Sequence, residues 1–221
     1  LKIRKDTNSD FFQWFHFRLT GAVDQRCKIS IINAGKSSYP GGWKNYQACA
    51  SYDREEWFRV PTTFRNGILT IDFEPEHNSV YFAYFAPYSY ERHLDLIHET
   101  QLFDNVSMEV VGKTFEGRDI EMLRVGKPGK NKKIIWVIAR QHPGESMAEW
   151  FIEGMLSRLL DEDDPVSRTL LKEAVFYVVP NMNIDGSIAG NLRSSASGAN
   201  LNREWQRPTK KYSPEVFYVR N

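Results

Sequence analysis

A histidine and a glutamate lie three residues apart in the segment 139–146, which reads Ala-Arg-Gln-His-Pro-Gly-Glu-Ser. Pro143 and Gly144 form a turn between His142 and Glu145, so the two side chains can converge on one point. An imidazole nitrogen and a carboxylate oxygen suit zinc, at ~2.0–2.2 Å from the metal. A third protein ligand and an open water position would complete a catalytic site. The same spacing also fits a surface turn that holds one histidine and one glutamate without a metal.

The segments around this pair have the pattern of an α/β domain. Residues 133–139 form a continuous apolar run, which predicts a strand covered on both faces. Residues 147–160 carry apolar side chains at helical spacing, and Ser146 with Glu149 predicts a capping box at the helix start. Ligands gather at the carboxyl edge of the strands in such sheets, which is where the pair would lie.

A second helix is predicted from Asp164 to about Glu173, because Asp164 is a cap residue followed by proline. Residues 175–179 predict another short buried strand. The order strand, helix, helix, strand predicts an α/β domain over residues 101–221, with at least partly parallel pairing.

The first hundred residues have a different pattern. Short apolar and aromatic runs alternate there with turn residues such as Asn66-Gly67. This predicts an all-β sandwich or barrel over residues 1–100. The expected strands lie at residues 11–19, 28–32, 57–60, 68–73 and 80–86.

A polar segment, residues 180–205, follows the last predicted strand and is rich in asparagine, glycine and arginine. Arg193, Asn202 and Arg203 offer planar, multidentate donors that match a carboxylate or a developing oxyanion. The alternative interpretation is a polar surface loop with solvated arginines.

Four motifs, in their order and spacing, resemble those of zinc carboxypeptidases of the M14 family, and in particular of the cytosolic carboxypeptidase subfamily. The resemblance implies a carboxypeptidase-like α/β domain, with a mixed sheet flanked by helices, after the N-terminal β-sandwich that the subfamily also carries. The first motif, His142-Pro143-Gly144-Glu145, resembles the family's first zinc-binding motif. The second and third motifs are Asn183-Ile184-Asp185-Gly186, which resembles Asn-Pro-Asp-Gly, and Gly190-Asn191-Leu192-Arg193, which resembles Gly-Asn-x-Arg. The fourth motif, residues 198–203, resembles Gly-x-Asp-Leu-Asn-Arg.

The resemblance also implies a role for each matching residue. His142 and Glu145 would bind one zinc ion per chain. Arg193 would polarise the scissile carbonyl and stabilise the tetrahedral oxyanion. Asn202 and Arg203 would hold the terminal carboxylate of the substrate.

Two positions depart from the family pattern. Asn200 stands in place of aspartate, which is expected to lose a contact that supports the ligands or shapes the loop. Ile184 stands in place of proline, which is expected to lose a rigid turn. Neither change removes a reacting group.

The family's third zinc ligand is a downstream histidine, and its general base is a glutamate further on. Neither has a matching position here, because the five histidines are His16, His77, His93, His98 and His142. We therefore expect the chain to be truncated, with the third ligand and the base beyond residue 221. The histidines at 77, 93 and 98 are expected to be surface or interface residues.

The expected function is that of a zinc metallocarboxypeptidase, which hydrolyses the C-terminal peptide bond of peptides or protein tails. The subfamily includes enzymes that trim glutamates. Arg140, Arg207, Lys210 and Lys211 could favour acidic substrates or could equally be solvated charges. One alternative is a zinc amidohydrolase that deacylates small N-acyl amino acids. Another is a non-catalytic binding protein with an incomplete metal site.

Composition argues against some partners. The formal net charge of +1 favours neither nucleic acid nor an anionic membrane. No apolar run approaches the ~20 residues of a membrane span, and the charged N-terminal segment lacks a signal-like core, which favours a cytoplasmic location. Cys27 and Cys49 are expected to be buried reduced thiols.

Overall fold

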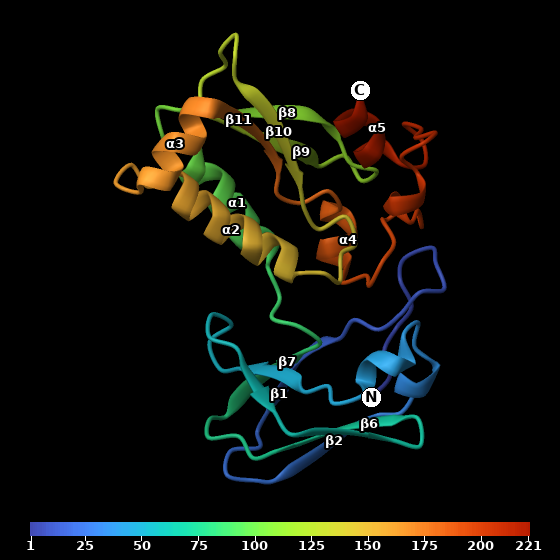
Figure 1. The fold of residues 1–221 in the computed structure, drawn as a ribbon. Helices are drawn as coiled ribbons and strands as arrows, with labels where there is room; N and C mark the ends of the chain where they lie inside the picture. Colours follow the sequence, from blue (N-terminus) through green and yellow to red (C-terminus); the bar gives the residue numbers. More distant parts are fainter.

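Two units of different class follow one another along the chain, and the computed structural model describes all of residues 1–221 (Figure 1). The first unit is a β-sandwich, as the sequence predicts. One sheet has the strand order β1-β7-β3-β4 and the other has the order β2-β6-β5. The elements are β1 (His16–Thr20), β2 (Cys27–Ile31), the 3₁₀ turns η1 (Ala34–Lys36) and η2 (Pro40–Trp43), β3 (Ala48–Ser51), β4 (Phe58–Val60), β5 (Thr62–Arg65), β6 (Ile68–Phe73) and β7 (Ser79–Ala83).

The predicted turn at Asn66-Gly67 joins β5 to β6. Both residues have positive φ, 49° and 78°, and Arg65 pairs directly with Ile68. A two-residue turn with both φ values positive matches the twist of the strands that it connects, and Asn-Gly is the sequence that adopts it most readily. The local sequence therefore sets the register of this hairpin.

The second unit is a mixed sheet with the strand order β10-β11-β9-β8, as the resemblance implies. Strands β10 and β11 are parallel, and the other pairs are antiparallel. The side chains of Leu123 and Val178 pack in one core with the helices that follow the β unit. Those of Met122 and Val179 pack in a second core on the opposite face. The strands are β8 (Val106–Lys113), β9 (Asp119–Val125), β10 (Lys133–Ile138) and β11 (Ala174–Val179).

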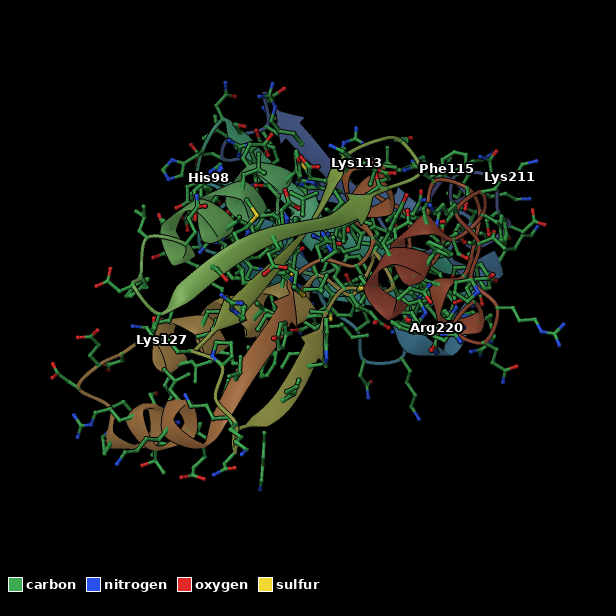
Figure 2. The ribbon with its side chains drawn as sticks, turned by 90° about the horizontal axis from the view of Figure 1, so that it is seen from above. His98, Lys113, Phe115, Lys127, Lys211 and Arg220 are labelled. Carbon is green, nitrogen blue, oxygen red and sulfur yellow. The ribbon has the colours of Figure 1, made fainter.

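Helices cover the two faces of this sheet unequally. The larger ones, α1, α2 and α3, gather on one side (Figure 1). On the other side α5 packs against β8, and Figure 2 shows Lys113 and Phe115 on the side of the molecule where Arg220 lies. The helical segments are α1 (Tyr90–Thr100), α2 (Met147–Leu159), α3 (Pro165–Glu173), α4 (Ile184–Ala189), the 3₁₀ turn η3 (Leu201–Arg203) and α5 (Pro214–Arg220).

Helix α1 lies within the first hundred residues but packs with the second unit. Its buried Leu96 and Ile97 share a core with Ile152 and Leu156 of α2. We therefore propose a boundary between the two units near residue 86 rather than near residue 100.

The prediction that the 133–139 strand is covered on both faces was wrong. β10 lies at an edge of the sheet, and Ile134, Trp136 and Ile138 are 68%, 51% and 40% exposed. Only the alternate residues Ile135 and Val137 pack against the core shared with the helices. A continuous apolar run shows that a strand is apolar on both faces, but not that both faces are covered within this chain.

Both predicted helix starts were confirmed, since α2 begins after Ser146 and α3 after Asp164, but the capping box predicted for α2 was wrong. Asp164 caps α3 by accepting the Val166 N–H at 2.7 Å. Ser146 makes no side-chain cap to α2, and its hydroxyl donates to the carbonyl of Ala86 at 2.7 Å. Glu149, the other half of the expected box, is fully buried.

Both cysteines carry free thiols, with Cys49 buried and Cys27 half-buried. None of the helices is long and apolar enough to cross a bilayer.

Candidate active site

The turn after β10 and the loop after β11 lie side by side, because the pairing of these strands continues past their ends. The Ala139 N–H donates to the Val179 carbonyl at 3.0 Å, and the Met182 N–H donates to the Ala139 carbonyl at 2.9 Å. Arg140 then takes a left-handed backbone conformation with φ of 48°, which turns the chain toward His142. Both segments with candidate residues therefore meet at the carboxyl edge of these strands.

The side chains of His142 and Glu145 converge. His142 Nδ1 lies 3.3 Å from Glu145 Oε1, with the imidazole buried and the carboxylate side chain 56% exposed. Two ligand atoms that share a tetrahedral zinc at ~2.0–2.2 Å would lie about 3.4 Å apart, so this separation fits the metal. No group of three or more His, Cys, Asp or Glu side chains that could hold a metal occurs in residues 1–221. The geometry of the pair is therefore compatible with two ligands of such a site.

Asn200 supports the imidazole from its other side. Its Oδ1 lies 3.3 Å from His142 Nε2. When a metal is bound, a hydrogen bond from Nε2–H to this oxygen would leave the lone pair of Nδ1 available to the metal. The presence of asparagine instead of aspartate predicted the loss of a supporting contact. The amide oxygen of Asn200 nevertheless makes such a contact with His142.

The groups around Glu145 favour the charged form of its carboxylate, which is the form that can bind a metal. The hydrogen bond to His142 holds the pKa of Glu145 below its usual range, against the opposing effect of partial burial. The nearby Arg193 guanidinium lowers this pKa further. Arg193 therefore lies close enough to the pair for its charge to act there.

The loop that carries Arg193 packs tightly on the turn of residues 142–145. The Gly144 N–H donates to the Leu192 carbonyl at 2.9 Å. A Cβ atom on Gly144 would lie only 2.8 Å from that carbonyl oxygen, so the close approach requires glycine. Gly186 at the start of α4 is equally confined, because a Cβ there would lie 2.7 Å from the Ser194 carbonyl oxygen.

The Asn183-Ile184-Asp185-Gly186 motif forms the start of α4. Asn183 caps the helix by accepting the Gly186 N–H at 3.2 Å. Ile184 occupies the first helical position, where proline is common, and its side chain is buried. The asparagine cap therefore forms the turn without the proline.

Asn202 and Arg203 lie in η3, directly after Asn200, and both are exposed. The Trp205 Nε1–H donates to the side-chain oxygen of Gln141 at 2.5 Å, which ties this segment to the residue before His142. The two side chains are therefore accessible from solvent in a segment that contacts the turn of residues 142–145.

The comparisons with known proteins agree with this geometry. Residues 1–85 match the cytosolic carboxypeptidase N-terminal domain, and residues 91–215 match the zinc carboxypeptidase family. The chain belongs to the M14 zinc carboxypeptidase family. The zinc carboxypeptidase match covers more than half of the residues and includes both the turn with His142 and Glu145 and the segment with Arg193, Asn202 and Arg203.

Similar proteins include bacterial and animal carboxypeptidases. The metallo-carboxypeptidase from Burkholderia cenocepacia is 52% identical, with a TM-score of 0.97 over 99% of this chain and 59% of that protein. An uncharacterized protein of Zymomonas mobilis is 52% identical over all of this chain and 57% of its own length. Cytosolic carboxypeptidase 6 of Mus musculus is 30% identical over all of this chain and 44% of its own length. The chain thus spans about half the length of the relatives it matches.

A buried charged network lies next to the turn that carries His142 and Glu145, and it was not predicted from the sequence. Glu149 of α2 accepts from Arg140 Nη1 at 2.5 Å and lies 2.9 Å from His93 Nδ1. His93 Nε2 lies 3.5 Å from a Glu121 oxygen. All four side chains are buried, and their formal charges balance when His93 is protonated.

His93 and Arg140 therefore correct two expectations. His93 is 1% exposed, so it is no surface residue, and Arg140 is 4% exposed, so it is not available to attract acidic substrates. Burial by itself lowers the pKa of His93, but the carboxylates of Glu121 and Glu149 outweigh it and raise the pKa to about 9. One signal was present in the sequence: Glu149 lies at helical spacing from the core residue Ile152, where a carboxylate needs a buried partner.

The remaining histidines lie away from the pair. His16, His77 and His98 are exposed, and Figure 2 shows His98 on the opposite side of the molecule from Lys211. Lys211 follows the η3 segment in the chain.

Proposed function

We propose that this protein is a zinc-dependent carboxypeptidase, which removes the last residue of peptides or protein tails. The observation that carries the proposal is the convergence of His142 and Glu145 at 3.3 Å, beside the charge of Arg193. These residues come from two different loops at the same edge of the sheet. A surface turn without a metal would not need this arrangement.

His142 and Glu145 would hold the zinc, and the fixed Nε2 contact to Asn200 would orient the imidazole. When bound, zinc lowers the pKa of water and polarises a carbonyl group. Arg193 would donate hydrogen bonds to the oxygen on which negative charge develops as the peptide carbonyl is attacked. Removal of one such donor typically reduces the rate by ~10²–10³-fold.

Asn202 and Arg203 would bind the α-carboxylate of the substrate. An arginine fork matches the two oxygens of a carboxylate, and both side chains are exposed beside the turn. A carboxylate anchored there orients the last peptide bond at the metal and excludes internal bonds. Selectivity for a free C-terminus would follow.

We further propose that substrates with C-terminal glutamate are among those cleaved. The exposed Arg207, Lys210 and Lys211, rather than the buried Arg140, remain the candidates to attract an acidic residue. A metallo-carboxypeptidase from Pseudomonas aeruginosa, 48% identical, was solved in complex with (2-guanidinoethylmercapto)succinic acid. The carboxylates of that ligand support a site for the α-carboxylate of a substrate, whereas its cationic guanidino group gives no support for an acidic side chain.

The decisive experiment combines zinc analysis with cleavage assays on the full-length protein. We expect stoichiometric zinc, cleavage of peptides with a free C-terminus, no cleavage of the same peptides after C-terminal amidation, and no deacylation of small N-acyl amino acids. His142→Ala should lose the zinc, whereas His98→Ala, which changes an exposed histidine on α1, should retain it. Full zinc occupancy in His142→Ala would refute the ligand assignment, and deacylation without peptide cleavage would favour an amidohydrolase.

A further inference from the structure

The N-terminal segment of the β unit reaches across to the second unit and enters the loop that carries Arg193. The carboxylate of Asp6 accepts three consecutive backbone N–H groups, from Leu192 at 2.6 Å, Arg193 at 2.8 Å and Ser194 at 2.9 Å. Asp6 is only 6% exposed. Figure 1 shows the blue N-terminal chain rising from the lower unit toward the orange and red segments of the upper one.

Consecutive N–H groups that point to one place form a concave site for an anion. Hydrogen bonds from such groups to a charged carboxylate are roughly twice as strong as those between neutral groups. Asp6 therefore fixes the main chain on both sides of Arg193, and with it the position from which the guanidinium extends.

Neighbouring residues of the same segment strengthen this contact. The Thr7 N–H donates to the side-chain oxygen of Asn191 at 3.0 Å, and Asn8 Nδ2 donates to the Ala196 carbonyl at 2.9 Å. A Cβ atom on Gly198 would overlap the carbonyl oxygen of Asn8, so the loop requires glycine where the segment passes.

The β unit also contacts the Arg193 side chain itself. Its guanidinium carbon lies 5.6 Å from the centroid of the Phe11 ring and 5.9 Å from that of the Tyr39 ring. A cation within about 6 Å of an aromatic face is attracted by it. Two side chains from the first unit therefore limit the positions that this guanidinium can occupy.

The loop in turn contacts the metal-binding turn. The Leu192 carbonyl accepts the Gly144 N–H at 2.9 Å, two residues from His142. Asp6 and the turn between the candidate zinc ligands therefore both contact Leu192 of this loop.

We propose that Asp6 is a positioning residue for Arg193, through which the β unit takes part in catalysis. This inference rests on the proposed carboxypeptidase function. Loss of the Asp6 charge should lower kcat, since the guanidinium would no longer be held where the oxyanion forms. It should leave KM and zinc content nearly unchanged, because neither the proposed carboxylate-binding residues nor the zinc ligands contact Asp6.

The test compares Asp6→Asn with Asp10→Asn in the full-length protein. Asp10 is a matched control because it lies on the same segment but pairs only with Lys5 at the surface. We expect Asp6→Asn to reduce kcat by about 10–100-fold, given that a displacement of ~1 Å can reduce a rate 10²-fold. Asp6→Glu, which keeps the charge, should recover part of the loss, and Asp10→Asn should have no effect.

A double substitution separates positioning from general destabilisation. In an Arg193→Ala background, Asp6→Asn should have no further effect on kcat. An equal loss in both backgrounds would overturn the proposal, as would an unchanged kcat in Asp6→Asn.

Amide hydrogen exchange provides a readout that does not depend on activity. Asp6→Asn should accelerate exchange at residues 192–194 and leave the amides of β11 protected as an internal control for folding. If the wild-type protein cleaves no peptide, the proposed function fails, but the exchange rates still decide whether Asp6 holds the loop. Unchanged exchange at residues 192–194 would refute that role.

Discussion

Substitution of Glu149 tests the buried network behind the candidate site. Its carboxylate is fully buried, 2.5 Å from Arg140 Nη1 and 2.9 Å from His93 Nδ1, and it accepts from Asn181 Nδ2 at 3.1 Å. Glu149→Gln would keep the shape of the side chain but leave two buried cations without their shared counter-charge. Removal of one partner from a buried ion pair typically costs about 3–5 kcal/mol.

That loss would be a large part of the ~5–15 kcal/mol by which a folded protein is usually stable. At ~2–4 °C per kcal/mol for a protein of this size, it corresponds to a fall in Tm of about 6–20 °C. The free energy of unfolding would be measured by urea titration at pH 6, where His93 is protonated.

Glu153→Gln is the matched control. Glu153 lies one helical turn later in α2 and pairs with Arg92 at 2.7 Å, but its side chain is 31% exposed. Solvent-accessible pairs contribute about 0–1 kcal/mol, so this substitution should have a much smaller effect. Equal losses of stability in the two variants would refute the view that Glu149 neutralises a buried network.

Four further predictions concern pH, zinc content, helix stability and substrate binding. The pKa of His93 is raised from 6.5 to about 9. Protonated His93 therefore contributes about 3 kcal/mol to the free energy of unfolding below pH 6.5, and this contribution is lost as the pH rises through 9. In urea titrations, His93→Gln should lack this decline in stability. Gly144→Ala should reduce zinc content measured by elemental analysis, because its Cβ would lie 2.8 Å from a main-chain oxygen. Gly154→Ala, in open space on α2, should raise stability by about 0.5–1 kcal/mol. Arg203→Ala should raise KM for peptides at unchanged zinc content, whereas Arg168→Ala, which changes an exposed arginine on α3, should leave both unchanged; equal losses of zinc and activity in Arg203→Ala would contradict its role in carboxylate binding.

The sequence was sufficient wherever short-range physics decides the structure. Asp164 followed by Pro165 predicted the start of α3, and Asn66-Gly67 predicted the hairpin between β5 and β6. The motif at His142 could be recognised because its residues lie close together in the sequence. Helix α1 was missed because most of its first turn is polar or aromatic, and its helical state depends on packing against α2.

The corrections at Ser146 and Glu149 have a common cause, which is competition from partners that are distant in the sequence. The Ser146 hydroxyl donates to the Ala86 carbonyl instead of capping α2. The Glu149 carboxylate contacts His93, 56 residues away, instead of completing the same capping box. The outer face of β10 is exposed because helices cover only one side of that strand. A helix cap contributes about one kcal/mol, whereas a buried charge without a partner costs several. The contacts that satisfy buried polar groups therefore form at the expense of the local cap.

The sequence by itself determined the two fold classes, the family resemblance and the identity of the candidate residues, because periodicity, turn residues and motif spacing are local properties. Only the tertiary structure decided what holds those residues in place. Asp6 and Arg193 are 187 residues apart, and nothing in either local sequence indicates that one carboxylate binds the backbone of the other's loop. Such a contact forms because folding brings the two units together, and a buried carboxylate must then find hydrogen-bond donors wherever the fold supplies them.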